Sequence, residues 1–248
     1  MKKENKFEYQ ENQYIFPYHH IPYLDSENNV VNHRSLGWGF KYFTYLLRIR
    51  ELVEEINPDS ILDVGCGEGR FLGLLGNRIR KVGVDLSPRP IKFAQAFHPD
   101  IEFHCADANQ LKEEFDVVTA IEVLEHVPDE QVTNFLKILE KRLIESGKII
   151  ISVPTTVLPV SEKHYRHYTL EILKQQLENS KINLEIEHVE YVYKSSSLLK
   201  LYSKLTQNKL WIIEIRPLRN FVWRMVKSKY TIANEGNGEE MIVILKKK

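Results

Sequence analysis

The sequence predicts a doubly wound α/β fold, in which a mostly parallel sheet of seven strands carries helices on both faces. Two observations lead to this class. Five short apolar segments alternate with amphipathic ones between residues 60 and 154, which is the order of repeated strand and helix units. A glycine-rich turn follows the first apolar segment, where a strand passes into a helix. Right-handed crossovers between parallel strands then place helices on both faces.

The five parallel strands are expected in short apolar runs, because a strand buried on both faces reads as a continuous apolar segment. These runs are residues 60–65, 81–86, 101–107, 115–122 and 147–154. Helices are indicated where apolar residues recur three and four positions apart, in the segments 69–78, 87–97 and 129–143. The sheet is completed to seven strands by later segments, with a helix at 169–179 and strands at 182–193 and 239–248.

The composition favours one soluble domain in a reducing compartment. The chain has 248 residues with 34 basic and 34 acidic side chains and an isoelectric point near 7.1, so its overall charge does not indicate a nucleic-acid partner. The two cysteines, Cys66 and Cys105, fall within expected buried elements and are predicted to be core thiols. Because the sequence shows neither a leader peptide nor an apolar run of about 18 residues, we expect a cytoplasmic protein.

A glycine-rich turn, "DVGCGEG", lies between the first predicted strand and the first helix. Gly65, Gly67 and Gly69 lack side chains, so the backbone N–H groups of the turn can approach an anionic or zwitterionic ligand at the positive end of the helix. A dinucleotide-binding fingerprint needs glycine or alanine at position 70, where this chain has Arg70. The turn therefore predicts a small cofactor other than NAD, or else only a tight connection.

Two aspartates follow the next two predicted strands at the same edge of the sheet. Asp85 in "VGVDLS" stands about twenty residues after the turn and is placed to accept hydrogen bonds from both hydroxyls of a ribose. Asp107 in "CADA" is placed to meet an adenine amino group, with Ala106 and Ala108 leaving room for the ring. The alternatives are a carboxylate at a helix N-terminus for Asp85 and an ordinary turn residue for Asp107.

These motifs resemble those of the class I S-adenosylmethionine-dependent methyltransferases, over about residues 52–154. The matching segments are "LDVGCGEG", "VGVDLS", "CADA" and "FDVVTAIEVLEHV". The resemblance implies S-adenosylmethionine as the cofactor and a Rossmann-like sheet of seven strands whose last strand is antiparallel. It also implies that Asp63 and the glycines hold the methionine end, Asp85 the ribose and Asp107 the adenine. The implied cofactor-binding set is Asp63, Gly65, Gly67, Gly69, Asp85, Leu86, Asp107, Ala108 and Glu122.

The segment "IEVLEHVP" carries Glu122, Glu125 and His126, whose offsets of three and four put them on one face if the segment is helical. An oxygen nucleophile must lose its proton, either to a base or through a metal that lowers its pKa. The segment resembles two subfamilies that hold a divalent ion through Glu-x-x-Glu-His, the ubiquinone-biosynthesis O-methyltransferases and the small-RNA 3′-terminal 2′-O-methyltransferases. This resemblance implies a Mg or Zn site at Glu122, Glu125 and His126, closed by His164 or His167 of "SEKHYRHYT".

Without a metal, the same side chains have other roles. Glu122 would contact the cofactor or substrate, Glu125 would cap the next helix, and His126 would line the site or act as general base. The catalytic candidates are therefore Glu122, His126 and His167. For the two downstream histidines, the alternative is a surface loop that orders a lid over the active site.

The N-terminal segment, residues 1–50, is rich in aromatic side chains and is predicted to form a lid ahead of a methyltransferase domain at 51–248. Its aromatic and histidine side chains either line a substrate pocket or pack on the sheet. They are Tyr18, His19, His20, Trp38 and Tyr42.

An insertion at about 194–238 separates the last two predicted strands. Residues 194–230 hold nine basic side chains and one acidic one, Glu214, while leucines and aromatics recur at helical spacing. This pattern suits amphipathic helices on an anionic membrane surface or a phosphate-bearing substrate. It also suits RNA, whose backbone attracts Lys and Arg and whose bases stack on aromatics, or a helical cover over the sheet edge.

Together these features predict an enzyme that methylates a hydroxyl on a small molecule, a sugar or a lipid- or carrier-linked substrate. It would be cytoplasmic, or peripheral to the inner face of the membrane through residues 194–230. An RNA terminal 2′-O-methyltransferase is the second hypothesis, which the neutral overall charge disfavours. A non-catalytic, cofactor-binding partner subunit is the third, which the intact motifs disfavour.

Overall fold

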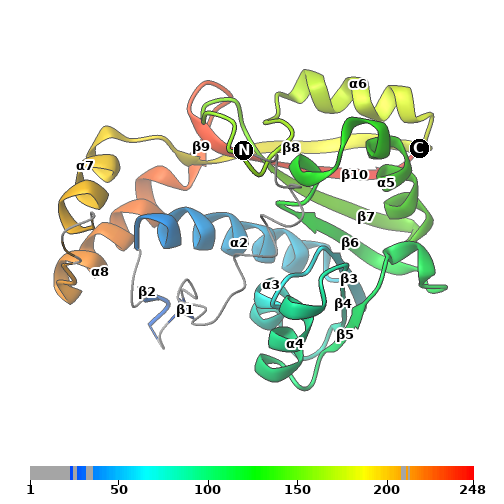
Figure 1. The fold of residues 1–248 in the computed structure, drawn as a ribbon, viewed down its shortest axis with the longest axis horizontal. Coiled ribbons are helices and arrows are strands. Elements are labelled where there is room, and N and C mark those ends of the chain that lie inside the picture. Colours follow the sequence, from blue (N-terminus) through cyan, green and yellow to red (C-terminus); the bar gives the residue numbers. More distant parts are fainter. Residues whose placement is uncertain (1–22, 25–26, 32–35, 208–210, 212) are drawn as a thin grey trace, which may run out of the picture.

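One twisted sheet organises the chain, of which the computed structural model describes residues 23–24, 27–31, 36–207, 211 and 213–248 (Figure 1). Its strands, from one edge to the other, are β5 (Glu102–Cys105), β4 (Arg80–Asp85), β3 (Ser60–Val64), β6 (Phe115–Ile121), β7 (Leu143–Pro154), β10 (Gly238–Lys247), β8 (Leu184–Lys194) and β9 (Ile232–Ala233). Two further strands, β1 (Tyr23–Leu24) and β2 (Val30–Val31), form a separate antiparallel pair.

The pairing confirms the predicted α/β class. Strands β5, β4, β3, β6 and β7 are mutually parallel, and β10 runs antiparallel to both of its neighbours, β7 and β8. The described sheet has eight strands rather than the predicted seven, because the two-residue β9 pairs with β8. So short a strand carries no periodic pattern by which a sequence could reveal it.

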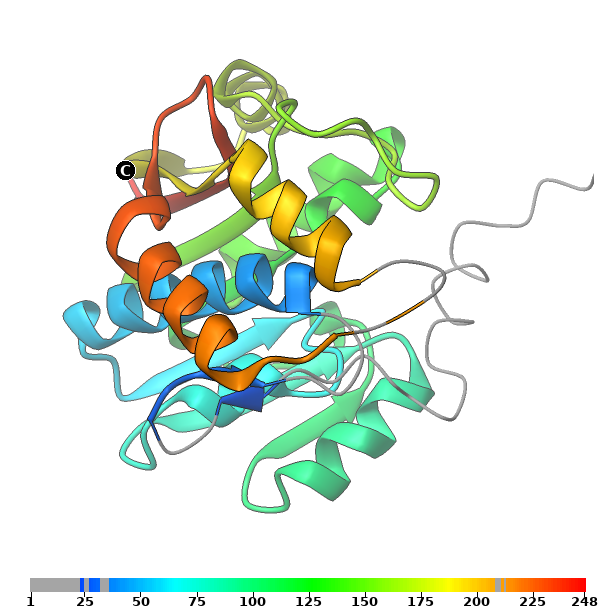
Figure 2. The ribbon, with the colours of Figure 1, turned by 90° about the vertical axis from the view of Figure 1, so that its left-hand side faces the viewer.

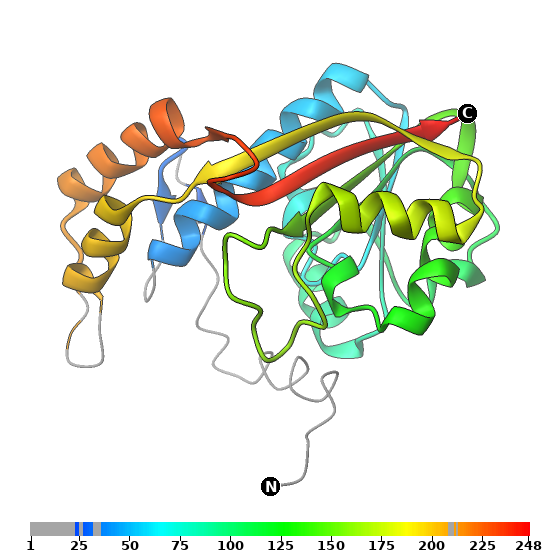
Figure 3. The ribbon, with the colours of Figure 1, turned by 90° about the horizontal axis from the view of Figure 1, so that it is seen from above.

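Helices cover both faces of the sheet (Figures 1 and 3). One face packs against α2 (Leu36–Ile56), α3 (Arg70–Leu74) and α4 (Pro88–Phe97), and the other against α5 (Asp129–Lys141) and α6 (Leu170–Ser180). Side chains of β7 alternate between these layers: Ile149 and Ile151 join the α5/α6 side, whereas Ile150 joins the α2 side. Both faces are therefore buried, as a doubly wound sheet requires.

Two local predictions were wrong for physical reasons. Cys66 is buried as predicted, but Cys105 is exposed, because β5 is the edge strand and only part of its surface is covered. The first helix was predicted to span 69–78 but ends at Leu74, since Gly73 and Gly76 weaken the helix there. Neither difference moves the carboxyl edge of the sheet.

The insertion forms two helices, α7 (Ser197–Thr206) and α8 (Arg216–Met225), followed by the π-helical turn η4 (Val226–Tyr230). It packs on the N-terminal part of α2, where the Phe40 and Trp223 rings stack at 5.7 Å and Trp223 Nε1 donates to the carbonyl of Asn28 at 2.6 Å (Figure 2). Helix α2 itself runs through residue 50, the predicted end of the lid segment. No helix within the described residues is long and apolar enough to cross a membrane.

Candidate active site

The glycine-rich turn lies at the carboxyl end of β3, where its backbone is hydrogen-bonded to the next strand. The amides of Gly65 and Cys66 both donate to the carbonyl of Val84, at 2.8 and 3.0 Å. All three glycines have positive φ, and a Cβ added to Gly65 would lie 2.5 Å from Cγ2 of Val123. Glycine is therefore required at position 65 both by backbone conformation and by space.

Asp85 fixes the far side of this turn. Its Oδ2 accepts a hydrogen bond from the Gly67 amide at 3.0 Å, and its Oδ1 accepts one from the Ser87 amide at 2.8 Å. A carboxylate has about four lone-pair positions, so these two contacts leave capacity for ribose hydroxyls. The next residue, Leu86, is exposed at the same strand end. Asp85 thus lies beside the turn, as predicted.

Asp63 lies beneath the turn, buried in β3. Thr119 Oγ1 of the neighbouring strand β6 donates to Asp63 Oδ1 at 2.7 Å. Burial raises the pKa of Asp63 to about 7, the Thr119 hydrogen bond opposes this rise, and the charge of Asp85 adds to it. A cationic ligand above the turn would favour the ionised form, so the site fits the positively charged methionine end of S-adenosylmethionine.

Asp107 has a local structural role. Its Oδ1 accepts from the Asn109 amide at 2.7 Å and caps the short helix η2 (Ala108–Gln110), in which Ala108 is buried. This is the turn role named above as the alternative. Contact between Asp107 and an adenine ring stays a prediction.

The segment after β6 is not a continuous helix. Glu122, Glu125 and His126 therefore do not share one helix face, as they would if the segment were helical. Only Leu124–His126 makes a single 3₁₀ turn, η3, and Glu122 precedes it with a φ of 55°. The left-handed conformation of a glutamate stores strain, which is frequent at functional sites. Glu122 Oε1 is buried and has no hydrogen-bond partner among the residues that the structure describes.

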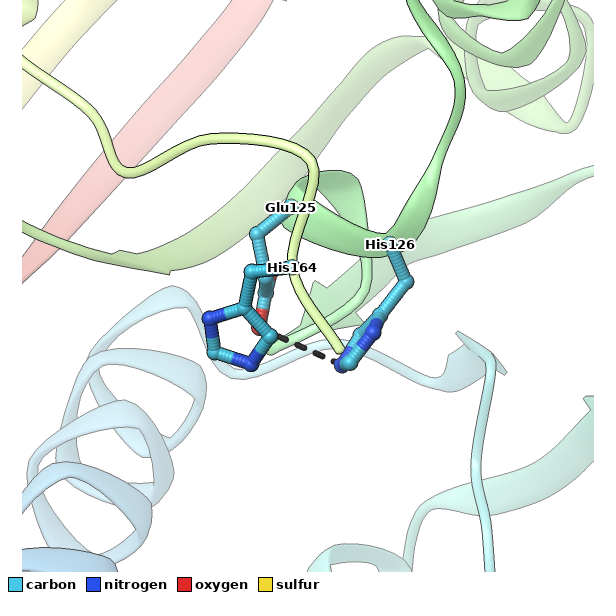
Figure 4. Close-up of side chains that lie close together, drawn as sticks. All are labelled: Glu125, His126 and His164. Carbon is cyan, nitrogen blue, oxygen red and sulfur yellow. Dashed lines mark ion pairs between the residues drawn. The ribbon is translucent and has the colours of Figure 1, made fainter. Parts of the chain in front are cut away.

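Three side chains converge beside this turn: Glu125, His126 and His164 (Figure 4). One ligand atom from each lies within 4.8 Å of the other two, and Glu125 Oε1 is 3.7 Å from His126 Nε2. The loop that carries His164 is held against η3, because the Tyr165 amide donates to the Glu125 carbonyl at 2.8 Å. This backbone hydrogen bond brings Glu125 and His164 together, although they belong to segments distant in the sequence.

Backbone carbonyls determine the tautomers of these histidines. His126 Nδ1 donates to the Lys163 carbonyl at 3.1 Å, and His167 Nδ1 donates to the Leu158 carbonyl at 3.0 Å. The Nε2 of His167 must then accept the 2.8 Å hydrogen bond from His164 Nδ1. His126 and His164 consequently both carry their lone pair on Nε2, the atom suited to bind a cation or take a proton.

His167 lies behind His164, and both of its ring nitrogens are engaged. His167 thus fixes the ring of His164, and its role as a general base stays a prediction, which these contacts disfavour. His126 is the base candidate that the geometry retains.

The donor set fits a divalent cation. Glu125 is completely buried, and neither of its carboxylate oxygens has a hydrogen-bond partner in the described part of the chain, so it does not cap the next helix. Burial raises the pKa of Glu125, with the charge of Glu122 adding to the effect, and burial together with His126 lowers the pKa of His164 to about 3. A cation would stabilise the ionised carboxylate and needs neutral imidazoles.

Of the four residues predicted to bind a metal, Glu125, His126 and His164 form one described group and Glu122 lies outside it, while metal binding by any of them stays a prediction. Ligand atoms around a tetrahedral ion lie about 3.4 Å apart, so a small inward rotation of these side chains would complete the geometry. One carboxylate with two imidazoles suits zinc or another transition metal better than Mg²⁺, which prefers oxygen ligands.

Two site residues were missed from the sequence. Lys41 of α2 and Glu240 of β10 form an ion pair of 3.2 Å, and Lys41 Nζ also donates to the Glu239 carbonyl at 3.4 Å. Burial lowers the pKa of Lys41, but the carboxylates of Glu240 and Glu122 more than offset this and leave it raised. In the sequence, Lys41 is a lysine within an apolar helix and Glu240 a glutamate within an apolar strand. Such residues are common in other helices and strands, so they did not indicate a site.

The predicted N-terminal pocket residues are only partly described. Tyr18, His19, His20 and the side chain of Trp38 lie outside the described residues. Tyr42 packs edge-on against Phe43 and Tyr45, at 5.3 and 5.6 Å between ring centroids. Its position agrees with the packing alternative.

The sheet order and the glycine-rich turn paired with Asp85 define the Rossmann-like fold of S-adenosylmethionine-dependent methyltransferases. A family model described as a methyltransferase domain matches residues 41–204, and the chain belongs to that family.

Curated relatives match part of the chain. The ubiquinone biosynthesis O-methyltransferase of Idiomarina loihiensis is 38% identical over 102 residues, covering 38% of this chain and 41% of that protein. The protein of the same name from Pseudomonas fluorescens strain SBW25 is 37% identical over 94 residues, covering 34% and 40%. The chain thus spans about two fifths of the length of these relatives.

Solved structures share the fold. A SAM-dependent methyltransferase from Archaeoglobus fulgidus superposes with a TM-score of 0.56 at 19% identity, covering 82% of this chain and 93% of that one. The methyltransferase domain of the bacterial CtHen1 protein superposes with a TM-score of 0.55 at 18% identity, covering 83% and 98%.

Proposed function

We propose that the protein transfers a methyl group from S-adenosylmethionine to a hydroxyl oxygen of a small or carrier-linked substrate, with a divalent cation held by Glu125, His126 and His164. The observation that carries this proposal is the convergence of these three side chains, with the buried Glu125 carboxylate lacking hydrogen-bond partners among the described residues. The names of the curated relatives support an oxygen acceptor.

The cofactor end of the site is built for binding and orientation. The glycine-rich turn presents backbone N–H groups, and Asp85 offers carboxylate oxygens for ribose hydroxyls. When bound, S-adenosylmethionine supplies a methyl group on a positively charged sulfur. Displacement at that carbon needs alignment more than covalent assistance, so positioning by the turn is the main contribution of these residues.

The acceptor end must handle a proton. Val123 packs over Gly65 of the cofactor turn. The turn η3 begins at the next residue, so its carboxylate–histidine group lies close to the cofactor turn. A cation held by Glu125, His126 and His164 would lower the pKa of a bound hydroxyl. The Nε2 atoms of both histidines are the ligating atoms, because their Nδ1 atoms donate to Lys163 and His167. The neighbouring Glu122 and the Lys41–Glu240 pair add charge around the acceptor.

The test is elemental analysis combined with calorimetric titration of S-adenosylhomocysteine, on the native protein and on His164→Ala. We expect close to one metal ion per native chain and a loss of the metal in His164→Ala, with cofactor affinity changed less than threefold. Methyl transfer to catechols and diols should fall at least a hundredfold in the variant. His104 on the edge strand β5 supplies the matched control, because His104→Ala should change none of these quantities.

Two outcomes would contradict parts of the proposal. A metal-free native protein that still methylates hydroxyls, but loses activity in His126→Gln, would assign His126 as the general base and remove the cation. A protein that does not bind S-adenosylhomocysteine would overturn the cofactor assignment of the glycine-rich turn.

A further inference from the structure

Helices α7 and α8 project beyond the sheet at its carboxyl edge, because α7 follows the end of β8 (Figures 2 and 3). One side of α7 is anchored to the body of the protein: Leu199 is buried, and Tyr202 packs in the cluster that contains Phe40 and Trp223. An adjacent side carries large apolar side chains that are exposed. The exposed fraction is 54% for Leu201 and 58% for Leu205.

The exposed apolar side chains on and next to α7, here called the apolar patch, are Leu198, Leu201, Leu205, Trp211 and Ile213. The three leucines are spaced by three and four residues and so lie on one side of α7. Trp211 and Ile213 lie beside the C-terminal end of α7, since Trp211 Nε1 donates to the Leu205 carbonyl at 3.0 Å and the Ile213 amide donates to the Thr206 carbonyl at 2.7 Å.

Basic side chains flank the apolar patch. Lys200 and Lys204 are exposed one turn apart on α7, and Arg216 is exposed at the start of α8. The single acidic residue of the region, Glu214, is neutralised by its ion pair with Arg219. The exposed charges beside the patch, on α7 and at the start of α8, are therefore predominantly positive.

We propose that the apolar patch and its basic flank dock on an anionic phospholipid bilayer, with the leucines and Trp211 entering the headgroup boundary and the lysines contacting lipid phosphates. An interfacial helix needs this combination of an apolar side and a cationic flank. Aliphatic side chains outnumber aromatic ones in the patch, and this composition favours hydrocarbon over nucleic-acid bases, which stack on aromatic rings.

Docking would turn the carboxyl edge of the sheet toward the bilayer, because α7 and the glycine-rich turn both follow carboxyl ends of strands that run in the same direction. A substrate anchored in the lipid would then reach the site without leaving the membrane surface. The proposal concerns a surface separate from the methyl-transfer residues, so it stands or fails independently of the proposed chemistry.

The test is cosedimentation of the full chain with vesicles of phosphatidylcholine alone and of phosphatidylcholine mixed with phosphatidylglycerol. We expect binding to the anionic vesicles only. Lys200→Gln with Lys204→Gln should weaken it roughly 25-fold, since each basic residue at an anionic surface contributes about fivefold. Leu201→Ser with Leu205→Ser should weaken it by more than a hundredfold, because each leucine removed from the apolar phase costs at least about tenfold.

Matched controls are Phe97→Ser on α4 and Lys174→Gln on α6, both exposed and distant in the fold from α7. They should bind vesicles as the native chain does. Every variant is first titrated with S-adenosylhomocysteine, and unchanged affinity shows that the fold is retained. The proposal is overturned by absent binding to anionic vesicles, or by equal binding of the leucine variant and the native chain. It is also overturned if the native chain binds single-stranded RNA but no vesicles, and the same variants lose that RNA binding.

Discussion

The ammonium group of Lys41 lies 3.2 Å from the carboxylate of Glu240, and this ion pair joins helix α2 to strand β10 beside the active site. The Glu240 side chain is completely buried, and desolvation raises its pKa. A buried carboxylate depends on its partner far more than an exposed one does. Lys41 opposes this rise in pKa, because its positive charge favours the ionised form of Glu240, whereas the nearby Glu122 carboxylate adds to the rise.

We predict that Lys41→Met lowers the free energy of unfolding by about 3 to 5 kcal/mol, since it removes the ion-pair partner of the buried Glu240 carboxyl. The double variant Lys41→Met with Glu240→Gln should recover most of this loss. Urea denaturation of the single and double variants measures the coupling. Lys246→Met, which removes an exposed ion pair with Glu185, is the control and should cost less than about 1 kcal/mol. Additive effects in the double variant would contradict the prediction.

Gly65→Ala should destabilise the protein by about 1 to 3 kcal/mol and weaken cofactor binding, because the added Cβ would lie 2.5 Å from Val123 at a φ of 78°. Adding Val123→Ala removes the steric part but not the conformational part, so it should restore a portion of the cofactor affinity. Gly76→Ala is the matched control, since a Cβ there meets nothing within 4 Å. If both alanine variants behaved alike, the steric argument would be wrong.

Asp85→Ala should weaken S-adenosylhomocysteine binding by about ten- to a hundredfold, because hydrogen bonds to a charged group contribute about 1.5 to 3 kcal/mol. The same change removes the acceptor of the Gly67 and Ser87 amides and so loosens the turn itself. Calorimetric titration measures the affinity, with exposed Asp100→Ala as control. Unchanged affinity in Asp85→Ala would refute the ribose assignment.

Stability should depend on pH through Asp63. Its pKa is about 7 in the folded protein, against an ordinary value of 3.8. Between these values the folded chain holds a proton that the unfolded chain has lost, so the contribution of Asp63 to stability is fully present below pH 3.8 and is lost as the pH rises to about 7. Asp63→Asn removes this dependence while its side-chain oxygen can still accept from Thr119.

The free energy of unfolding of Asp63→Asn should therefore rise relative to the native chain by about 1.4 kcal/mol per pH unit across that window. Denaturation at pH 5 and pH 8 measures the difference, and Asp100→Asn, an exposed change, should run parallel to the native chain. Parallel curves for Asp63→Asn as well would show that its carboxyl titrates normally.

The parts of the fold predictable from sequence are those determined by local pattern. Apolar runs and the spacing of glycines located β3, β4, β6 and the cofactor turn, because both signals act over a few residues. The edge position of β5, and hence the exposure of Cys105, depends on strand order, which no local pattern contains. The two-residue strand β9 is below the length that any periodicity can indicate.

The site shows the same division. Glu125 and His126 were predictable from a short motif, but the choice between His164 and His167 depended on which imidazole faces η3 and which carbonyl fixes each ring. Lys41 and Glu240 meet across 199 positions of sequence, and neither position has a neighbouring motif. Glu122 was predicted as the last residue of the strand 115–122, whereas β6 ends at Ile121 and Glu122 has a left-handed backbone, which no local pattern indicates.

Strand β10 has a consequence for biosynthesis, since it sits between β7 and β8 although it follows both along the chain. Until β10 is in place, β7 forms an open edge of the sheet and β8 has no neighbour that joins it to that edge. An unpaired apolar strand edge invites association with other nascent chains. Residues Gly238–Lys247 close this gap by pairing with both flanking strands at once, so assembly of the sheet is complete only when this segment has been made.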